Sequence, residues 1–468
     1  MSRIDLNNVD LAWLRMENPT NPMMITVVLR FKGQIDYDRL ISLLDVSLGR
    51  YRRFRQRIIR PDGFFRRPFW EDDPQYRVED HVECEQLQPP ADETSLLELI
   101  NRKMNTRLDF AHALWKLTLV DNYPEGNVFI IRVHHCIADG ISLMQVLHQM
   151  TRTSPDEPAN QAPADNLNRD ERQLNREPAI PLTAVQAVER SQVSATISTS
   201  KPGEGKSKSV RGNLYRKPTF TEIIAATARI VFRPPDPPTI LKGPLGEIKR
   251  AVWSEPLDLP EIKKIARSNN ATVNDVVMAV TSGAIRRYMD LHQDNRKRNI
   301  RAFILVNMRG NSFDEELGNK FGLVFCSLPL DREQPLDRLS ALKQGMDSLK
   351  ASAEYAATYL ILHILGQMPE WIEHLATMIL DTKGTVVATN VPGPRHPIYL
   401  AGTLVNSMIG FVPQSGRIGV GLSFISYNNQ VLVGLNVDAG LISDPEKFLE
   451  LFHEEFKALL AAISTVSG

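Results

Sequence analysis

His134-His135-Cys136-Ile137-Ala138-Asp139-Gly140 is the stretch of this sequence that constrains the fold most strongly. Residues 127–133, which precede it, are β-branched or aromatic at most positions, and this predicts a buried strand. Apolar residues recur at near-helical spacing after Gly140, so a helix is predicted to begin just beyond the turn. The order strand, turn and helix therefore delivers two adjacent histidines to the end of a strand.

The two histidines are predicted to have different roles. Successive side chains of a strand point to opposite faces, so only one of His134 and His135 lines a cavity easily, while the other packs or braces the turn. An unperturbed imidazole titrates near pH ~6.5, so near neutrality it is largely unprotonated and accepts a proton from a hydroxyl. The stretch therefore predicts one catalytic histidine that acts as a base.

Three other interpretations of the stretch are packing, metal binding and hydrolysis. A pair of histidines at a strand end is often a packing feature. The chain shows neither the helical i, i+4 histidine spacing nor the paired cysteines that supply converging ligands, so no metal site is predicted. Ser142 follows His135 by only seven residues, and no G-x-S-x-G elbow surrounds it, which argues against a nucleophilic serine.

Length, charge and cysteine content narrow the class of protein. The 468 residues, 43% of them hydrophobic, can fill the cores of two domains. The 55 basic and 55 acidic residues balance, so no overall field favours nucleic acid. The aromatic and arginine-rich residues 50–60 are expected to form a solvated face, with contact to anionic lipid or a nucleotide phosphate as the alternative.

The expected location is cytoplasmic. Three widely spaced cysteines argue for a reducing compartment. No basic-then-apolar signal opens the chain, and charges interrupt every apolar run before it reaches about 18 residues. The longest apolar run, residues 356–368, is predicted to be a helix on or in the protein that can touch a membrane surface.

The pattern along the chain predicts mixed α and β structure on both sides of a linker. Residues 155–215 are polar and rich in Pro, Ser and Gly, so they bury too little apolar surface to offset chain entropy. We therefore expect domains at 1–154 and 216–468, joined by this flexible linker with one short helix at 181–190. Helices are predicted at 37–48, twice within 257–288 and at 445–463, and strands at 24–31, 301–307, 323–328, 384–389, 419–427 and 430–438.

The histidine stretch resembles the HHxxxDG pattern of CoA-dependent acyltransferases of the chloramphenicol-acetyltransferase-like superfamily. Further segments in order resemble the bacterial wax ester synthase/diacylglycerol acyltransferase family over nearly the whole chain. Ala113 departs from the usual proline of that family, and the linker is longer and more polar than expected. The matching segments are Leu108-Asp109 with Ala113-Leu114-Trp115, Asn274-Asp275, Gly318-Asn319 and Asn390-Val391-Pro392-Gly393-Pro394.

This resemblance implies an α+β fold of two chloramphenicol-acetyltransferase-like domains, with mixed sheets flanked by helices and an active-site tunnel at their interface. His135 would lie near the middle of the tunnel and move an acyl group from acyl-CoA, the co-substrate, to a fatty alcohol or diacylglycerol. No further cofactor and no acyl-enzyme are expected. Transfer to another acceptor, transfer from a carrier-protein thioester, and an inactive lipid-binding relative are the alternatives.

The resemblance also suggests a role for Asn274. This family places its Asn-Asp segment near the site, and an amide can donate to an oxyanion without changing charge, so Asn274 is a candidate oxyanion donor. The alternative is that Asn274 caps the helix that follows. Asp275 is expected to stabilise the start of that helix or to form a salt bridge.

The remaining motif residues are expected to be mainly structural. His134 and Gly140 belong to the turn, and Asp139 is expected to brace it, with Arg309 and Arg395 both open as partners.

Asn390 and the Pro-Gly-Pro segment after it are expected to fix a turn near the interface of the halves. Leu114 and Trp115 are candidate substrate contacts, with core packing as the alternative for Trp115. The expected partners are acyl-CoA, the acceptor lipid and a peripheral membrane or lipid-droplet surface, such as the inner face of the plasma membrane, and not nucleic acid.

Overall fold

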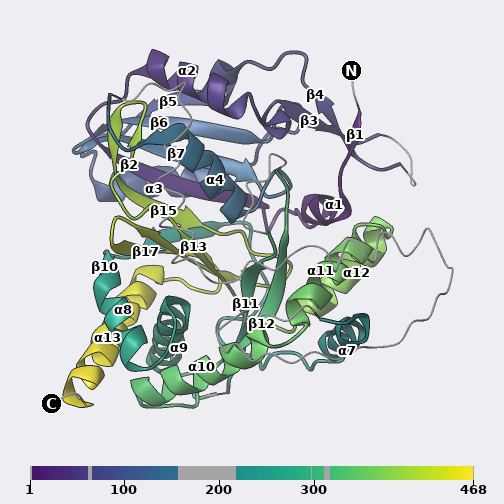
Figure 1. Cartoon of the computed structure of the whole chain (residues 1–468), viewed down its shortest axis with the longest axis vertical. Helices are drawn as coiled ribbons and strands as arrows, with labels where there is room; N and C mark the ends of the chain where they lie inside the picture. Colours follow the sequence, from purple (N-terminus) through teal and green to yellow (C-terminus); the bar gives the residue numbers. More distant parts are fainter. Residues whose placement is uncertain (1–2, 62–65, 157–217, 297, 310–316, 467–468) are drawn as a thin grey trace, which may run out of the picture.

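The computed structural model describes residues 3–61, 66–156, 218–296, 298–309 and 317–466. These residues form two mixed seven-stranded sheets, one above the other in Figure 1, and a three-stranded sheet near the N-terminus. Helices flank both large sheets (Figure 1). The predicted α+β class, with mixed sheets flanked by helices, is confirmed. The predicted linker and its short helix lie almost entirely outside the described residues.

The first large sheet carries the histidine stretch at the end of β7. The central strand β2 is antiparallel to both β7 and β15, and it pairs Met24 with His134. Val, Ile and Phe fill these strands because both faces are covered. In spatial order the strands are β5 (Val82–Gln86), β6 (Trp115–Tyr123), β7 (Gly126–His134), β2 (Met24–Lys32), β15 (Thr403–Phe411), β14 (Tyr399–Leu400) and β8 (Thr151–Arg152).

Among the four helices α1 to α4, three pack beside this sheet, whereas α1 packs mainly against α11 (Glu354–Leu365) and α12 (Glu370–Asp381). Helix α4 begins at Gly140, the last residue of the motif, as predicted. Asp139 is its N-cap, because the side chain accepts a hydrogen bond from the backbone N–H of Ser142 at 2.9 Å. The helices are α1 (Asn8–Arg15), α2 (Tyr37–Leu48), α3 (Glu93–Met104) and α4 (Gly140–Met150). The small sheet and two short 3-10 helices are β1 (Ile4–Asp5), β4 (Phe69–Asp72), β3 (Gln56–Ile59), η1 (Arg52–Phe54) and η2 (Val78–His81).

The second large sheet has β13 at its centre, parallel to both β11 and β16, with antiparallel pairs outside. In spatial order its strands are β10 (Leu257–Asp258), β17 (Gln430–Asp438), β16 (Val420–Tyr427), β13 (Val386–Pro392), β11 (Ile300–Asn307) and β12 (Phe321–Leu328), with β9 (Lys249–Trp253) beside β17. The helices are α7 (Phe220–Val231), α8 (Leu259–Ser268), α9 (Val273–Leu291), α10 (Pro335–Lys350), α11 (Glu354–Leu365), α12 (Glu370–Asp381) and α13 (Pro445–Val466).

One segment crosses the predicted division of the chain. β14 and β15 belong to residues 216–468, yet they complete the first sheet by pairing with β8 and β2. Gly434 of β17 lets the two sheets approach, because a Cβ there would lie 2.0 Å from the carbonyl oxygen of Gly410 in β15. The two halves are therefore joined by shared strands as well as by side-chain packing.

Most predicted elements are present with small differences in their bounds. The helix at 37–48 and the strand at 430–438 have the predicted bounds. The largest difference is in β13, which begins at Val386 instead of 384 and continues to Pro392. Asn390 therefore lies inside a strand, paired with Phe424, and the prediction that it fixes the turn was wrong. Gly393 continues the pairing with β16, since its N–H donates to the carbonyl of Ser426 at 2.9 Å, and the chain bends at Arg395 and His396.

Candidate active site

The two adjacent histidines face opposite sides, as the strand geometry predicts. The N–H of Cys136 donates to Nδ1 of His134 at 3.1 Å, so Nδ1 accepts and the ring proton sits on Nε2. That Nε2 lies 2.5 Å from a carboxylate oxygen of Glu17 and donates to it. His134 is therefore buried between two fixed partners and braces the turn.

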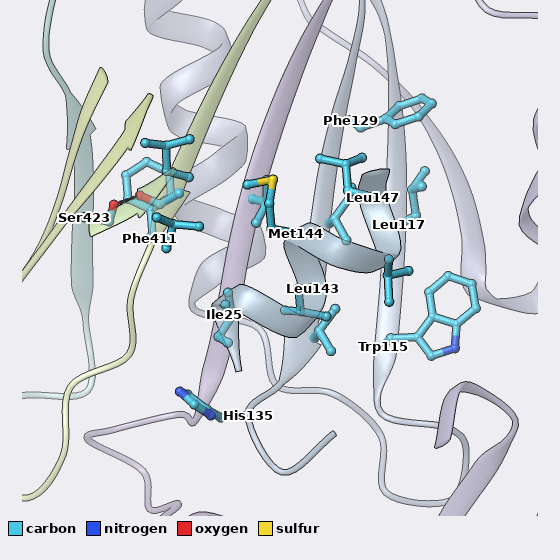
Figure 2. A pocket seen from close by; sticks show the side chains of 18 of the residues that line it. Ile25, Trp115, Leu117, Phe129, His135, Leu143, Met144, Leu147, Phe411 and Ser423 are labelled. Carbon is cyan, nitrogen blue, oxygen red and sulfur yellow. Dashed lines mark hydrogen bonds between the residues drawn. The ribbon is translucent and has the colours of Figure 1, made fainter. Parts of the chain in front are cut away.

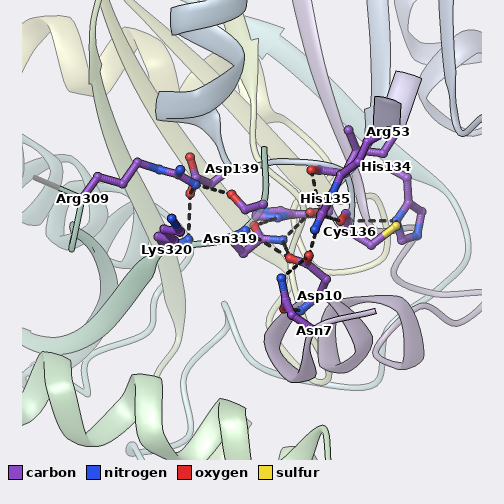
Figure 3. A network of polar contacts seen from close by, with 12 residues as sticks. Asn7, Asp10, Arg53, His134, His135, Cys136, Asp139, Arg309, Asn319 and Lys320 are labelled. Carbon is purple, nitrogen blue, oxygen red and sulfur yellow. Dashed lines mark hydrogen bonds and ion pairs between the residues drawn. The ribbon is translucent and has the colours of Figure 1, made fainter. Parts of the chain in front are cut away.

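His135 is held by an amide. Asn319 Nδ2 donates to Asp10 Oδ1 and to the carbonyl oxygen of His135, both at 2.8 Å, which fixes the orientation of the amide (Figure 3). Its Oδ1 then accepts from His135 Nδ1 at 2.9 Å. The ring proton consequently sits on Nδ1, and Nε2 carries the lone pair. Both amide hydrogens of Asn319 are used, so this residue orients the imidazole.

His135 is neutral because it is buried. Only 2% of the residue is exposed, and this burial lowers the pKa of His135 to about 4, against the opposing effects of a backbone hydrogen bond and of Asp139. Trp13 stacks on the imidazole with ring centroids 4.2 Å apart and an interplanar angle of 9°. The stacked ring is thus fixed in orientation and able to accept a proton at neutral pH.

Helix α1 and the arginine-rich segment complete the support of His135. Asp10 of α1 is fully buried and accepts from the Asn319 amide and from Arg53. Arg53 also donates to the carbonyl oxygen of Cys136 at 3.1 Å. Burial raises the pKa of Asp10, and the Arg53 charge opposes that rise. The interpretation of residues 50–60 as a solvated face was wrong for Arg53, which links α1 to the histidine turn.

Asp139 selects Arg309 from its two candidate partners. Its Oδ1 caps α4, while its Oδ2 accepts from an Arg309 guanidinium nitrogen at 2.8 Å and from the N–H of Lys320 at 3.1 Å. Arg309 also donates to the carbonyl oxygen of Gly318. Because both charged groups are almost fully buried, loss of either partner leaves an uncompensated charge. The ion pair therefore joins the turn to the strand ends of the second sheet.

His135 lines two separate cavities. The first lies between the first sheet and α4, and its walls are almost entirely apolar (Figure 2). The second lies between α1, the strands β11 and β12, and the helices α11 and α12. His135, Leu305 and Val412 line both. The side chains of the first cavity include Ile25, Val27, Leu117, Phe129, Ile131, Leu143, Met144, Leu147 and Phe411.

The predicted substrate contacts and oxyanion donor lie in different places. Trp115 lines the first cavity and donates from Nε1 to the carbonyl of Phe54 at 2.8 Å, so it also belongs to the core. Leu114 is fully buried and lines neither of the two cavities. Asn274 lies in the first turn of α9 and also lines neither.

The cap of α9 differs from the prediction. Thr272 caps the helix and forms a capping box with Asp275, so the alternative in which Asn274 is the cap was wrong. The expected role of Asp275 at the helix start is confirmed. The role of Asn274 as an oxyanion donor stays a prediction.

The Gly318-Asn319 segment matched the family pattern, but no role was predicted for Asn319. Neither Asp10 nor Trp13 was predicted to be functional. Only the Asn319 match offered a signal, because Asp10 lies 309 positions and His135 184 positions from Asn319 along the chain. Together these residues present the lone pair of a neutral imidazole between two largely apolar cavities. Such a group can accept a proton from an alcohol whose chain is buried beside it.

Comparisons with known proteins find similar sequences along nearly the whole chain. A model of the wax ester synthase/diacylglycerol acyltransferase catalytic domain matches residues 6–277, and one of the WS/DGAT C-terminal domain matches residues 317–460. A Mycobacterium tuberculosis protein described as a probable diacylglycerol O-acyltransferase is 26% identical, covering 98% of this chain and 96% of its own. The O-acyltransferase WSD of Acinetobacter baylyi is 23% identical, covering 85% and 84%.

Two solved structures show the same fold. The wax ester synthase/diacylglycerol acyltransferase from Marinobacter aquaeolei VT8 aligns with a TM-score of 0.68 at 21% identity, covering 98% of this chain and 100% of that chain. The first condensation domain of the calcium-dependent antibiotic synthetase aligns with a TM-score of 0.62 at 14% identity, covering 99% and 96%. The two-domain α+β architecture expected from the pattern along the chain and from the family resemblance is thereby confirmed.

Proposed function

The chain belongs to the wax ester synthase/diacylglycerol acyltransferase family of O-acyltransferases, and we propose that His135 is the general base of its transfer reaction. The reaction esterifies a long-chain fatty alcohol or a diacylglycerol with the acyl group of acyl-CoA. One observation carries this proposal, namely the neutral His135 imidazole, which lines two largely apolar cavities.

In the proposed reaction His135 moves one proton. Nε2 takes the proton of the acceptor hydroxyl as its oxygen attacks the thioester carbonyl carbon. The tetrahedral intermediate then breaks its carbon–sulfur bond, and the imidazolium returns the proton to the departing CoA thiolate. Asn319 Oδ1, 2.9 Å from Nδ1, holds the ring in this tautomer through both steps. General-base catalysis of this kind contributes ~10²- to 10⁴-fold.

The apolar walls support long hydrocarbon substrates. Each buried CH₂ group contributes about 0.8 kcal/mol, so a cavity with walls like those of the first one favours a long chain over a short one. We assign the hydrocarbon chain of one reactant to the first cavity and the other reactant to the second cavity. The two cavities then form the two arms of the expected tunnel, with the reacting atoms beside His135.

We also propose that α12 rests on the surface of a membrane or lipid droplet. Among the described residues no helix has both the length and the apolar character to cross a bilayer. The apolar run 356–368 was expected to touch the surface, but α11 packs much of it inside. Exposed apolar side chains gather on α12, where Trp371 is 61% exposed together with Leu375, Met378 and Ile379. A second exposed apolar set lies on and just after α7, at Phe220, Ile224, Val231 and Phe232. The opposite face of α12 lines the second cavity. A water-insoluble acceptor would therefore travel only a short distance from the lipid surface to this cavity.

A combined assay tests the reaction. Purified protein is incubated with palmitoyl-CoA and either hexadecanol or dioleoylglycerol, and free CoA and ester are followed together. We expect equal amounts of both products. Release of CoA without ester would indicate a thioesterase, and no turnover over a broad panel of acceptors and thioesters would favour a lipid-binding protein.

Flotation with anionic liposomes tests the surface contact. Replacement of Trp371 and Leu375 by serine should reduce the bound fraction and leave turnover of a detergent-dispersed substrate unchanged. Equal flotation of the variant and the unaltered protein would contradict the role of α12.

A further inference from the structure

The second cavity has a polar end that the proposed reaction does not use. Asp381, the last residue of α12, is 3% exposed, and its Oδ1 accepts from Ser415 Oγ at 3.1 Å. Its Oδ2 is buried and forms no hydrogen bond of normal geometry among the described residues, although the backbone N–H of Arg417 lies near enough to the carboxyl to lower its pKa. Thr377 lies one helical turn earlier, and its Oγ1 is buried and unpaired in the same way. All three residues line the second cavity, whose other walls are mostly apolar.

Two unpaired polar atoms on one buried helix face need an explanation. Each such atom costs about 1–3 kcal/mol when nothing satisfies it, and buried polar atoms of native proteins are usually hydrogen-bonded. The Lys242 ammonium donates to the carbonyl oxygens of Thr382 and Gly384 at 2.7 and 2.8 Å and acts on Asp381 only through its charge. Burial also raises the pKa of Asp381 to about 7, so near neutrality the carboxyl is available both as an acceptor and as a donor.

We propose that Asp381 and Thr377 bind a hydrogen-bonding group of the substrate that fills the second cavity, at a point removed from its reacting atom. The inference rests on the proposed function and adds specificity to it: this cavity selects a chain that carries a hydroxyl, ester or amide over a plain hydrocarbon. Two reactants supply such a group. One is the glycerol backbone of a diacylglycerol acceptor, and the other is the pantetheine arm of acyl-CoA, which carries two amides.

A glycine loop packs directly against the Asp381 carboxylate. Gly416 has a φ of +53°, and a Cβ at that position would lie 1.3 Å from Asp381 Oδ2. Asn21 Nδ2 donates to the carbonyl oxygen of Gly416 at 2.6 Å and fixes this loop from the other half of the chain. Because Gly416 has no side chain, the Asp381 carboxylate can pack directly against this loop.

Substitution of the two polar residues tests the proposal. Thr377→Val removes only the hydroxyl, and Asp381→Leu removes the carboxyl at similar volume, while Thr94→Val on the exposed face of α3 is the matched control. The kcat/KM is measured for dioleoylglycerol and hexadecanol, together with the KM for palmitoyl-CoA and the Tm. Because Thr377→Val removes an unpaired polar atom, its Tm should be unchanged or higher.

The outcomes separate the two reactants. If the acceptor is recognised, the ratio of kcat/KM for dioleoylglycerol to that for hexadecanol falls ~10-fold or more in both variants. If pantetheine is recognised, the ratio is unchanged and the KM for palmitoyl-CoA rises ~10-fold with either acceptor. An unchanged ratio and an unchanged KM in Thr377→Val would overturn the proposal, as would a fall in Tm alone in Asp381→Leu.

Binding measurements keep the test independent of turnover. Affinity for dioctanoylglycerol, dodecanol and palmitoyl-CoA is compared between His135→Ala and His135→Ala/Thr377→Val. Weaker binding of dioctanoylglycerol or palmitoyl-CoA in the double variant, with dodecanol unchanged, supports the polar end even if the unaltered protein forms no ester. Equal binding of all three by both variants contradicts it.

Discussion

His134 and His135 are neighbours of the same type, but the structure treats them differently. Glu17, a carboxylate, accepts from His134, and the ring is enclosed beside Phe110. Asn319, an amide, accepts from His135, whose ring lines two cavities. Both partners fix the orientation of a ring, but the amide does so without placing a charge beside it. The comparison indicates that the base is kept neutral by burial and oriented by a neutral partner.

The largest effect should come from removing the base. His135→Ala deletes the proton acceptor while its surroundings remain, so kcat should fall ~10²- to 10⁴-fold with Tm nearly unchanged. Steady-state kinetics and a melting curve measure the two effects. Turnover close to that of the unaltered protein would show that His135 is not the base. The proposed difference in role between His135 and His134 would then be wrong.

The pH dependence should show the neutral state of His135 directly. Its pKa of about 4 predicts that kcat/KM stays level as the pH falls from neutrality to about 5, where a base with a pKa of 6.5 would lose ~30-fold. Between about pH 4 and pH 6.5, His135 is mostly neutral in the folded chain and mostly protonated in the unfolded chain. The unfolded chain therefore binds more protons in this range. This group therefore makes stability rise with pH across that window and fall as the pH drops below 6.5. A rate profile falling with an apparent pKa near 6.5 would contradict the account.

Asn319 tests the orientation of the ring. Asn319→Leu keeps the volume but leaves His135 Nδ1 and Asp10 without their shared partner, so kcat should fall ~10- to 100-fold, with a smaller change in KM. Gln at the same position keeps the amide and should recover part of the rate. Full activity of Asn319→Leu would show that stacking on Trp13 suffices to orient the base.

Glu17 tests the bracing role of His134. Glu17→Gln keeps an oxygen acceptor but removes the charge, so the free energy of unfolding should fall by about 1–2 kcal/mol. The rate should change only a few-fold because His135 keeps its own partners. Denaturant unfolding and kinetics on the same preparation separate the two effects. A large loss of kcat at unchanged stability would place His134 in the chemistry.

Asn274 should give the smallest effect. As an oxyanion donor it would lower turnover by ~10²-fold when replaced by alanine. Its position in the first turn of α9, away from the walls of both cavities, favours a change of less than ~3-fold. The kcat of Asn274→Ala decides between the sequence prediction and the geometry.

Local patterns predicted the histidine turn well because strand alternation and helix capping depend on neighbouring residues. The division of roles between His134 and His135 and the start of α4 at Gly140 both follow from such short-range rules. The partners of His135 do not, since Asp10 and Asn319 are brought together only by the complete fold. Composition alone likewise assigned Arg53 to the surface.

The local sequence pattern also could not predict which distant strands pair or which helix faces are exposed to solvent. β15 completes a sheet that begins with residues almost 400 positions earlier, which no local pattern records. The apolar run 356–368 is more apolar than α12, and contacts with neighbours bury much of it, whereas one apolar face of α12 stays exposed. Hydrophobic content predicts a helix but does not show which face meets solvent.

The central claim is that His135 is a neutral imidazole with its proton on Nδ1 and its lone pair on Nε2. Nitrogen NMR of the protein with ¹⁵N-labelled histidine, assigned with His135→Ala, measures both ring nitrogens between about pH 5 and pH 8. The account predicts one neutral tautomer, protonated at Nδ1, across the whole range. An imidazolium that titrates near pH 6.5, or a proton on Nε2, would contradict it.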